Sequence, residues 1–485
     1  MFRARRIFGV DLRSLGLFRI ALAALLLYDL ADRARDLGVF YTDDGILPRE
    51  TALRYFPRLL QACVHLATGS WWGEALIFAV MAACAAALLA GWRTRIASVL
   101  CWYLWVSLQC RVPPILYGMD NLLRLLLFWG MFLPWGARFS VDAARRPGAR
   151  PRESDVFSAA SAALLVQVAV MYWFTAAAKS APEWTSEGSA LYYTLHIDHF
   201  VTPLGACLRE HRGLCRALTF ATLGWESFGP FLFFSPVAFL PARLLAVAGF
   251  AALHVGIGAC MSVGLFPVLG LISLIPFLPA EAWELRFRGR ARLEALARAA
   301  AARAARIPGA GSPFFELPRA LDVLVAVLAA YAFAWNLMTP PPDGMTVPEW
   351  AREPGYLLRL DQDWSMFAPF PMKDNGWFVV RGRLEDGRGV DLLHGRPGEP
   401  DPARPRWIYR EYKNKRWKKY LMNLREDRWA EERQNYAEWL CRSYNRARSG
   451  RDRLRELTVK YMMEEIKPQG PAPIVEQTFV RYYCY

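Results

Sequence analysis

Residues 172–184, with the sequence YWFTAAAKSAPEW, end an uncharged run that covers residues 156–178. At a rise of about 1.5 Å per residue, a helix over this run is long enough to cross a bilayer. Lys179 is the first charged residue after the run. Its side chain can snorkel, with the ammonium among lipid headgroups. Alternatively it can act as a base, because partial loss of water disfavours the ammonium form.

The composition around this stretch is typical of a membrane protein. Hydrophobic residues make up 54% of the 485 residues, and they are gathered in long blocks. The formal net charge of +15 could indicate a nucleic-acid partner, but the basic residues cluster in short loops between the apolar blocks. Such clustering encodes orientation in a membrane, and no compact basic nucleic-acid motif is present. We therefore expect a lipid bilayer as partner and no nucleic acid.

The apolar blocks predict an all-α polytopic bundle of about nine transmembrane helices. Besides residues 156–178, the expected spans are residues 15–30, 74–92, 96–110, 121–135, 214–234, 243–260, 265–278 and 321–338. The basic residues before the first span and in residues 138–152 belong on the cytoplasmic side. The count then puts the amino terminus inside, Lys179 at the external face and the carboxy terminus outside the cytoplasm.

The chain divides into four parts. Residues 1–280 are expected to form the transmembrane domain, and residues 281–318 a basic amphipathic segment on the cytoplasmic surface. Residues 319–339 hold the last span, and residues 340–485 an extracytoplasmic α+β domain. In this last part, alternation around Asp386 and Gly387 predicts a hairpin. Residues 409–448 have helical spacing, and residues 454–463 and 476–485 are expected strands.

The nine cysteines show no CxxC and no metal-ligand spacing, so no metal site is expected. If their surroundings are oxidising, either Cys207 with Cys215 or Cys441 with Cys484 could form a disulfide. The other five lie in or beside apolar segments, where cysteine behaves as a small hydrophobic residue: Cys63, Cys84, Cys101, Cys110 and Cys260.

Titratable residues at membrane depth are functional candidates, because an unpaired charge is costly there. Glu226 and His254 enter the bilayer from opposite sides to a similar depth, which makes His254 the nearest plausible partner for Glu226. Asp120 and Arg124 have the i,i+4 spacing of a self-paired couple. Each has a structural alternative: Glu226 can be a protonated helix-packing group, His254 a core histidine with its hydrogen bonds made, and Asp120 with Arg124 a local ion pair. Together with Lys179 they could instead line a polar pocket that opens outward.

Four motifs, in this order, give the chain a family resemblance. They are DLRSLGLFRIALAALLLYDL with YTDDGILPR, then YGMDNLLRLLLFWGMFLP, YWFTAAAKSAPEW and HVGIGACMSVGLFPVLGLISLIPFLP. They resemble the bacterial horizontally transferred transmembrane (HTTM) domain, which is related to vitamin K-dependent gamma-carboxylase. The resemblance covers roughly residues 8–280. The segment LRLDQDWSMFAPFPMKDNGWFVV also resembles an extension of long bacterial members.

The resemblance implies a chemistry. In the carboxylase, a lysine followed five positions later by tryptophan deprotonates a reduced quinone. Oxygen then converts the quinone into a strong base, and carbon dioxide adds to a glutamate carbanion. Lys179 and Trp184 keep that spacing, and His254 matches a histidine segment. We expect Lys179, Glu226 and His254 to be catalytic, and we expect substrate or cofactor binding by Tyr172, Trp184, Asp120, Asn121 and Arg124.

The chain also departs from the carboxylase. Where that enzyme has an assisting histidine, this sequence has Asp120 and Asn121, and the peptide-recognition region has no visible counterpart. Two hypotheses follow. One is a quinone-dependent enzyme of the bacterial cytoplasmic (inner) membrane, which uses a reduced quinone of vitamin K or menaquinone type. The other is a non-enzymatic scaffold or maturation factor for a secreted peptide or protein. A transporter is weaker, because no internal repeat is found.

Overall fold

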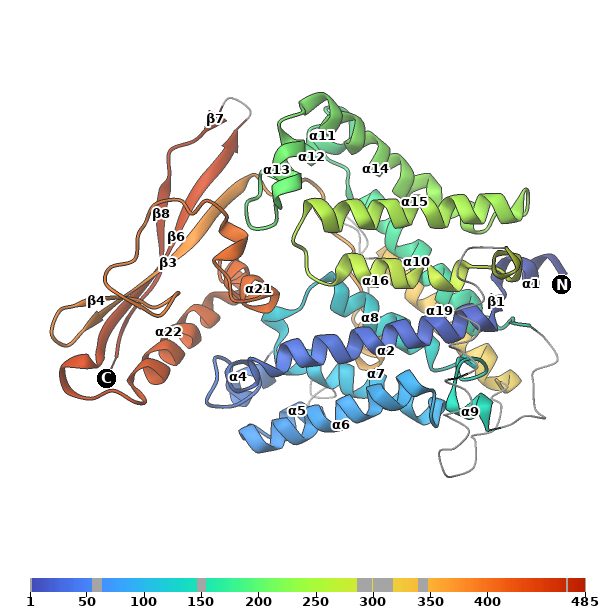
Figure 1. The fold of residues 1–485 in the computed structure, drawn as a ribbon, viewed down its shortest axis with the longest axis horizontal. Helices are drawn as coiled ribbons and strands as arrows, with labels where there is room; N and C mark the ends of the chain where they lie inside the picture. The colour runs from blue at the N-terminus through green and yellow to red at the C-terminus, as the bar shows by residue number, and fades with distance from the viewer. Residues whose placement is uncertain are drawn as a thin grey trace.

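The computed structural model describes residues 2–54, 63–145, 154–285, 299, 317–338, 348–467 and 470–484. Figure 1 shows a helical bundle that holds the amino terminus and a sheet domain at the opposite end that holds the carboxy terminus. The expected basic segment at residues 281–318 lies mostly outside the described residues. The long axes of the bundle helices run toward the sheet domain, which caps one end of the bundle.

Five helices in the described part of the chain are long and apolar enough to cross a membrane. They are α2 Leu12–Ala34, α6 Trp71–Ala90, α10 Ala159–Ala178, α15 Phe239–Cys260 and α19 Arg319–Met338. The other expected spans correspond to helices that are shorter or more polar, namely α7 Thr94–Arg111, α8 Gly118–Gly130, α14 Arg212–Phe233 and α16 Phe266–Ser273. A polytopic helical bundle is therefore present, and the count of nine spans is not confirmed.

Shorter elements connect these helices. They are α1 Phe2–Phe8, β1 Val10–Asp11, α3 Leu37–Phe40, α4 Arg49–Leu53, α5 Val64–Ala67, η2 Pro113–Ile115, α9 Val141–Ala144, β2 Asp155–Val156, α11 Pro182–Thr185, α12 Ala190–His196, α13 Pro203–Arg209, η3 Ile275–Phe277 and α17 Ala280–Glu284. Of these, α12 and α13 lie at the sheet-domain end of the bundle (Figure 1).

Local sequence explains where α10 begins and ends. Ser158 caps its first turn by accepting a hydrogen bond from the backbone of Ser161, which satisfies an otherwise free N–H group. The following residues are uncharged and mostly apolar, and most of them are buried. The helix ends at Lys179, and Pro182 opens α11 three residues later, because proline is favoured at the first helical position. The chain thus turns sharply just after its first charge.

The carboxy-terminal domain is built on an antiparallel sheet. Its elements are α20 Glu349–Leu358, β3 Asp374–Leu384, β4 Gly389–Asp391, β5 Arg396–Pro397, η4 Ile408–Arg410, α21 Lys415–Asn423, η5 Asp427–Trp429, α22 Ala430–Asn445, η6 Gly450–Asp452, β6 Leu454–Lys467, β7 Gly470–Pro471 and β8 Val475–Tyr483. The strand order is β5-β4-β3-β6-β7, with β8 also paired to β6. This confirms the predicted hairpin, helical region and two terminal strands, within the described residues.

One of the two disulfides considered from sequence is formed. Cys441 on α22 is bonded to Cys484, just after β8, so the helix is fixed to the end of the sheet. Cys207 and Cys215 are both free thiols, and the buried Cys215 thiol instead donates to the carbonyl of Leu208 at 3.4 Å.

The sheet domain is not a separate appendage. A single cluster of buried apolar side chains includes α2 and α8 of the bundle together with α21, α22 and β6 of the carboxy-terminal domain. Helix α21 lies between the sheet and the bundle (Figure 1), and its Asn423 donates a hydrogen bond to the carbonyl of Pro114 at 2.7 Å. Burial of shared apolar surface therefore fixes the domain to the end of the bundle.

Candidate functional site

The charged end of α10 is buried. Lys179 is 5% exposed, and its ammonium forms an ion pair with the carboxylate of Glu226 on α14, which is 6% exposed. The same ammonium lies 4.4 Å from the centre of the Trp184 indole ring, where the negative face of the ring attracts a cation. A snorkelling lysine would reach outward to headgroups, so that interpretation is wrong for this residue.

His254 has a different partner from the one expected. Its Nε2 lies 2.8 Å from the hydroxyl of Tyr172 on α10, whereas Glu226 pairs with Lys179. The Tyr172 ring stacks on Phe250 at a centroid distance of 3.9 Å. Gly270 on α16 leaves the space that the imidazole fills, because a Cβ there would lie 2.2 Å from Cε1 of His254. The histidine is therefore held tightly between α10 and α16.

The Lys179–Glu226 and Tyr172–His254 pairs lie along one side of α10. Tyr172 and Lys179 are about two helical turns apart, which places them on the same face. Helices α14 and α15 supply the partners, and α14 packs against both α10 and α15. Four buried polar atoms from these helices have no hydrogen-bond partner within the described residues, namely Trp173 Nε1, Thr175 Oγ1, Trp225 Nε1 and His254 Nδ1. Unsatisfied polar atoms in a buried place are uncommon, and they are available to a polar ligand.

Residues 359–373, which we call the strap, run from α20 to β3 across this site. The Trp184 indole donates a hydrogen bond to the carbonyl of Phe367 at 2.9 Å, and the Ala181 N–H donates to the carbonyl of Pro369 at 3.3 Å. Lys373 forms an ion pair with Glu183, and its hydrogen bond to that carboxylate raises the pKa of Lys373. The carboxy-terminal part thus covers the segment that carries Lys179.

The amino-terminal end of the strap is attached to α8 and α10. Arg124 forms an ion pair with Asp361 at 3.5 Å, and Asp361 also pairs with Arg359 at 3.2 Å. Next to it, the Gln167 amide donates to the side-chain oxygen of Gln362 at 2.7 Å. The strap is therefore anchored by polar contacts at both ends.

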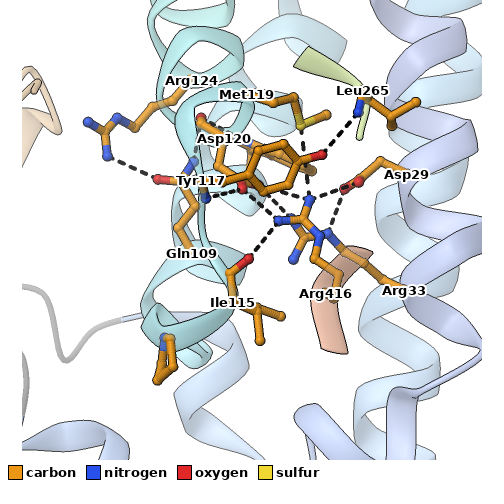
Figure 2. A network of polar contacts seen from close by, with 12 residues as sticks. Asp29, Arg33, Gln109, Ile115, Tyr117, Met119, Asp120, Arg124, Leu265 and Arg416 are labelled. Atoms are coloured by element: carbon orange, nitrogen blue, oxygen red, sulfur yellow. Dashed lines mark hydrogen bonds and ion pairs between the residues drawn. The ribbon is translucent and has the colours of Figure 1, made fainter. Parts of the chain in front are cut away.

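Asp120 belongs to a second, fully buried cluster, which we call the charge cluster (Figure 2). Its carboxylate contacts Arg33 and Arg416, each at 2.6 Å. Asp29 in turn contacts Arg33 at 2.5 Å and Arg416 at 2.9 Å. Two carboxylates and two guanidinium groups thus balance each other away from water, as buried charges must.

The expected pair of Asp120 with Arg124 is therefore wrong. Arg124 points away from the charge cluster and donates to the Gln109 side chain at 3.0 Å (Figure 2). Its other partner is Asp361 of the strap. The i,i+4 spacing allowed a local pair, but distant parts of the chain bring charges with better geometry. Asn121 is half-buried on α8.

The candidate residues therefore fall into two groups. Lys179, Glu226, Trp184, Tyr172 and His254 are gathered along α10, whereas Asp120, Asn121 and Arg124 lie on α8. Helix α16 lies between the groups: the Phe266 ring lies 5.8 Å from the His254 ring, and the Leu265 N–H donates to the Tyr117 hydroxyl at 3.3 Å. Within the described residues, no group of three His, Cys, Asp or Glu could hold a metal ion.

Sequence reasoning missed several of these residues. Asp29 and Arg33 are charges one turn apart inside an apolar helix, so the rule that intramembrane charges are functional or paired would have found them. Arg416 stands in a basic run, NKRWKK, in which no local signal sets it apart. The attachment of the strap to Trp184 is a tertiary contact that periodicity does not report.

Comparison with known proteins agrees with this architecture. The HTTM domain model matches residues 9–283, which is more than half of the chain. No curated protein and no solved structure gives a match. The match confirms the resemblance drawn from the four motifs, and the apolar helices agree with it. The chain is a multi-pass membrane protein, and it belongs to the HTTM domain family, with the relation to gamma-carboxylase that this membership implies.

Proposed function

We propose that this protein is a quinone-dependent enzyme of the bacterial cytoplasmic membrane, in which Lys179 is the general base. One observation carries the proposal: the amine of Lys179 is buried at the end of an apolar helix, paired with Glu226 and covered by the strap. A structural lysine at a membrane boundary would have no need of this enclosure. In the proposed orientation the amino terminus lies in the cytoplasm and the carboxy-terminal domain lies outside it.

The ion pair can supply a free amine. Lys179 and Glu226 can exist as ammonium and carboxylate or, with the proton moved, as amine and carboxylic acid. Away from water the charged form loses its hydration, which narrows the free-energy difference between the two forms. When the proton lies on Glu226, the Lys179 nitrogen can accept a proton from a bound hydroxyl group. Trp184 holds the lysine side chain in place from one side.

The surroundings fit a flat, apolar ring with polar oxygens. Tyr172 and Trp225 both pack against the Phe250 ring and supply aromatic faces, and the unpartnered Nδ1 of His254 could contact a ligand oxygen. A reduced quinone would supply an acidic hydroxyl and, with oxygen, a strong base for removing a substrate proton. Oxygen and carbon dioxide are the co-reactants that the family resemblance suggests, and a secreted peptide or protein is the proposed substrate.

The test is turnover and retention of reduced menaquinone by the purified full-length protein in lipid nanodiscs. We expect Lys179→Ala to abolish turnover while the thermal unfolding midpoint shows that the protein is folded. The matched control is Lys413→Ala, because Lys413 also forms an ion pair, with Asp36, but at a largely exposed position. Full turnover by a folded Lys179→Ala variant would refute the assignment.

The same variants separate the alternative, a non-enzymatic maturation factor. The observation that favours it is the strap itself, which joins the external domain to the bundle through Trp184 and Arg124. In that case Lys179→Ala would retain maturation of the exported partner, and Trp364→Ala, which removes a buried strap side chain, would lose it. The orientation is tested separately with alkaline phosphatase fused after Tyr485, which we expect to be active.

A further inference from the structure

We propose that Cys63 and Cys110 form a redox pair, whose reduced state holds the strap in place through Arg359. From the sequence both cysteines had been interpreted as small hydrophobic residues, and neither has a part in the proposed lysine chemistry. The inference concerns the strap and its anchoring, so it stands or fails independently of what Lys179 does.

The two thiols face each other. The side chains of Cys63, just before α5, and Cys110, near the end of α7, interact directly with each other. They are 6% and 0% exposed, and neither is bonded to another cysteine. The backbone beside Cys63 is fixed to α7, because the His65 N–H donates to the Ser107 hydroxyl at 3.0 Å. The two side chains therefore extend from neighbouring backbone segments that are fixed to each other, as a disulfide requires.

A guanidinium group reaches the same sulfur. Arg359 Nη1 lies 3.8 Å from Sγ of Cys110, and its Nη2 lies 3.4 Å from the side-chain oxygen of Gln109. Cys110 therefore lies beside both a thiol and a cation. A neighbouring cation favours the thiolate, which is the reactive form of cysteine. This placement marks Cys110 as the attacking sulfur and Cys63 as the second thiol of the pair.

The contact holds Arg359 in an unfavourable backbone conformation. Arg359 ends α20 with φ of 53°, a left-handed conformation that costs free energy for a residue other than glycine. Its backbone N–H donates to the carbonyls of Gly355 and Tyr356, as at a helix C-cap, and its side chain adds contacts to Cys110, Gln109 and Asp361. Since Arg359 is the first residue of the strap, loss of the sulfur contact would weaken the anchor.

The reaction balances with a small-molecule disulfide as oxidant. The Cys110 thiolate attacks one sulfur of that disulfide and releases one thiolate, which gives a mixed disulfide on Cys110. The Cys63 sulfur, having lost its proton, then attacks Cys110 and releases the second thiolate. Cys63 and Cys110 are oxidised to a disulfide, and the reagent is reduced to two thiols. A disulfide sulfur is a poor acceptor, so Arg359 loses its partner.

The experiment treats the full-length protein in nanodiscs with bis(2-hydroxyethyl) disulfide, then alkylates it and maps peptides by mass spectrometry. We expect a linked pair of peptides that contain Cys63 and Cys110 and that has lost the mass of two hydrogen atoms. Cys101→Ser, a buried cysteine on the same helix, should leave the link unchanged, and Cys63→Ser should abolish it. Recovery of both cysteines alkylated after denaturation would overturn the pair.

The second readout is hydrogen–deuterium exchange of residues 359–373. We expect faster exchange in the oxidised protein than in the reduced protein, and no oxidant effect in Cys63→Ser. If that variant does not fold, the comparison of oxidised with reduced wild-type protein decides alone. A linked pair with unchanged exchange in the strap would overturn the role of Arg359.

Discussion

The guanidinium of Arg416 lies 2.6 Å from the carboxylate of Asp120, although 296 positions separate the two residues in the chain. The arginine comes from the carboxy-terminal domain and the aspartate from the bundle. Both are buried with Asp29 and Arg33 in the charge cluster. The membrane part alone contributes two carboxylates to the cluster and one guanidinium, so its charges balance only when α21 is docked.

Replacing Arg416 is therefore expected to destabilise the whole protein. Arg416→Ala leaves two buried carboxylates with one cation, and breaking a buried ion pair in this way costs about 3–5 kcal/mol. The measurement is the free energy of unfolding of the detergent-solubilised protein. Arg446→Ala is the control: it removes a pair with Asp44 at exposed positions, which is worth roughly 0–1 kcal/mol. Equal effects of the two variants would contradict the role given to the cluster.

Glu226→Gln tests the buried lysine pair. The substitution keeps the shape of the side chain but leaves the Lys179 ammonium without its anion, so we expect a loss of stability of about 3–5 kcal/mol. The double variant Lys179→Met with Glu226→Leu removes both charges and should recover most of that loss. Thermal unfolding followed by circular dichroism measures both. No recovery in the double variant would show that the pair is not coupled.

Gly270→Ala tests the position of the imidazole. The new Cβ would lie 2.2 Å from Cε1 of His254, so the ring must move and its hydrogen bond to Tyr172 must break. We expect a cost of about 1–3 kcal/mol and reduced retention of reduced menaquinone. Gly256→Ala on α15 is the control, since nothing lies within 4 Å of its added Cβ. The prediction fails if Gly270→Ala binds quinone as the wild type does.

The stability of the docked domain should depend on pH through His199. This residue lies outside the spans, where Tyr412 and Tyr461 contact its two ring nitrogens at 2.9 and 3.3 Å. Burial, and then the nearby cations Arg425, Lys418 and Lys415, lower its pKa well below 6.5. The folded state therefore keeps the ring neutral while the unfolded chain takes up a proton below about pH 6.5.

Because only the unfolded state gains that proton, stability should be complete above pH 6.5 and fall as the pH decreases toward the lowered pKa. Unfolding free energies between pH 7.5 and about pH 5, within the range where histidine titrates, would measure the slope. His199→Gln should reduce the slope, since the amide does not titrate. An equal slope in wild type and variant would assign the effect to other groups.

Local patterns predicted the carboxy-terminal domain well. The Asp386-Gly387 turn, the charged helical region and the last strands follow from alternation, helical spacing and turn residues, whereas the division of that region into α21 and α22 does not. The spacing of Lys179 and Trp184 was noted from the sequence, but the contact of the ammonium with the indole ring is seen only in the structure. Features that depend on neighbouring residues can be predicted from the sequence, because a short segment of chain fixes their geometry.

The partners of buried charges could not be predicted in the same way. The sequence pairs Asp120 with Arg124, because the two lie one helical turn apart. It pairs Glu226 with His254, because the two have a similar expected depth in the membrane. The structure pairs Asp120 with Arg416 and Glu226 with Lys179. Which helix faces contact each other is decided by the packing of the entire bundle, and a single sequence does not report that packing.

The charge cluster means that the evolutionary module and the cooperative folding unit do not coincide in this chain. A truncation at the family boundary, near residue 283, would retain both residues of the lysine pair. It would, however, leave one unbalanced negative charge in the interior and remove the strap from Trp184. The interior of the bundle is neutral only after α21 has reached the carboxy-terminal end of α2. Completion of the membrane part thus waits for the last third of the polypeptide.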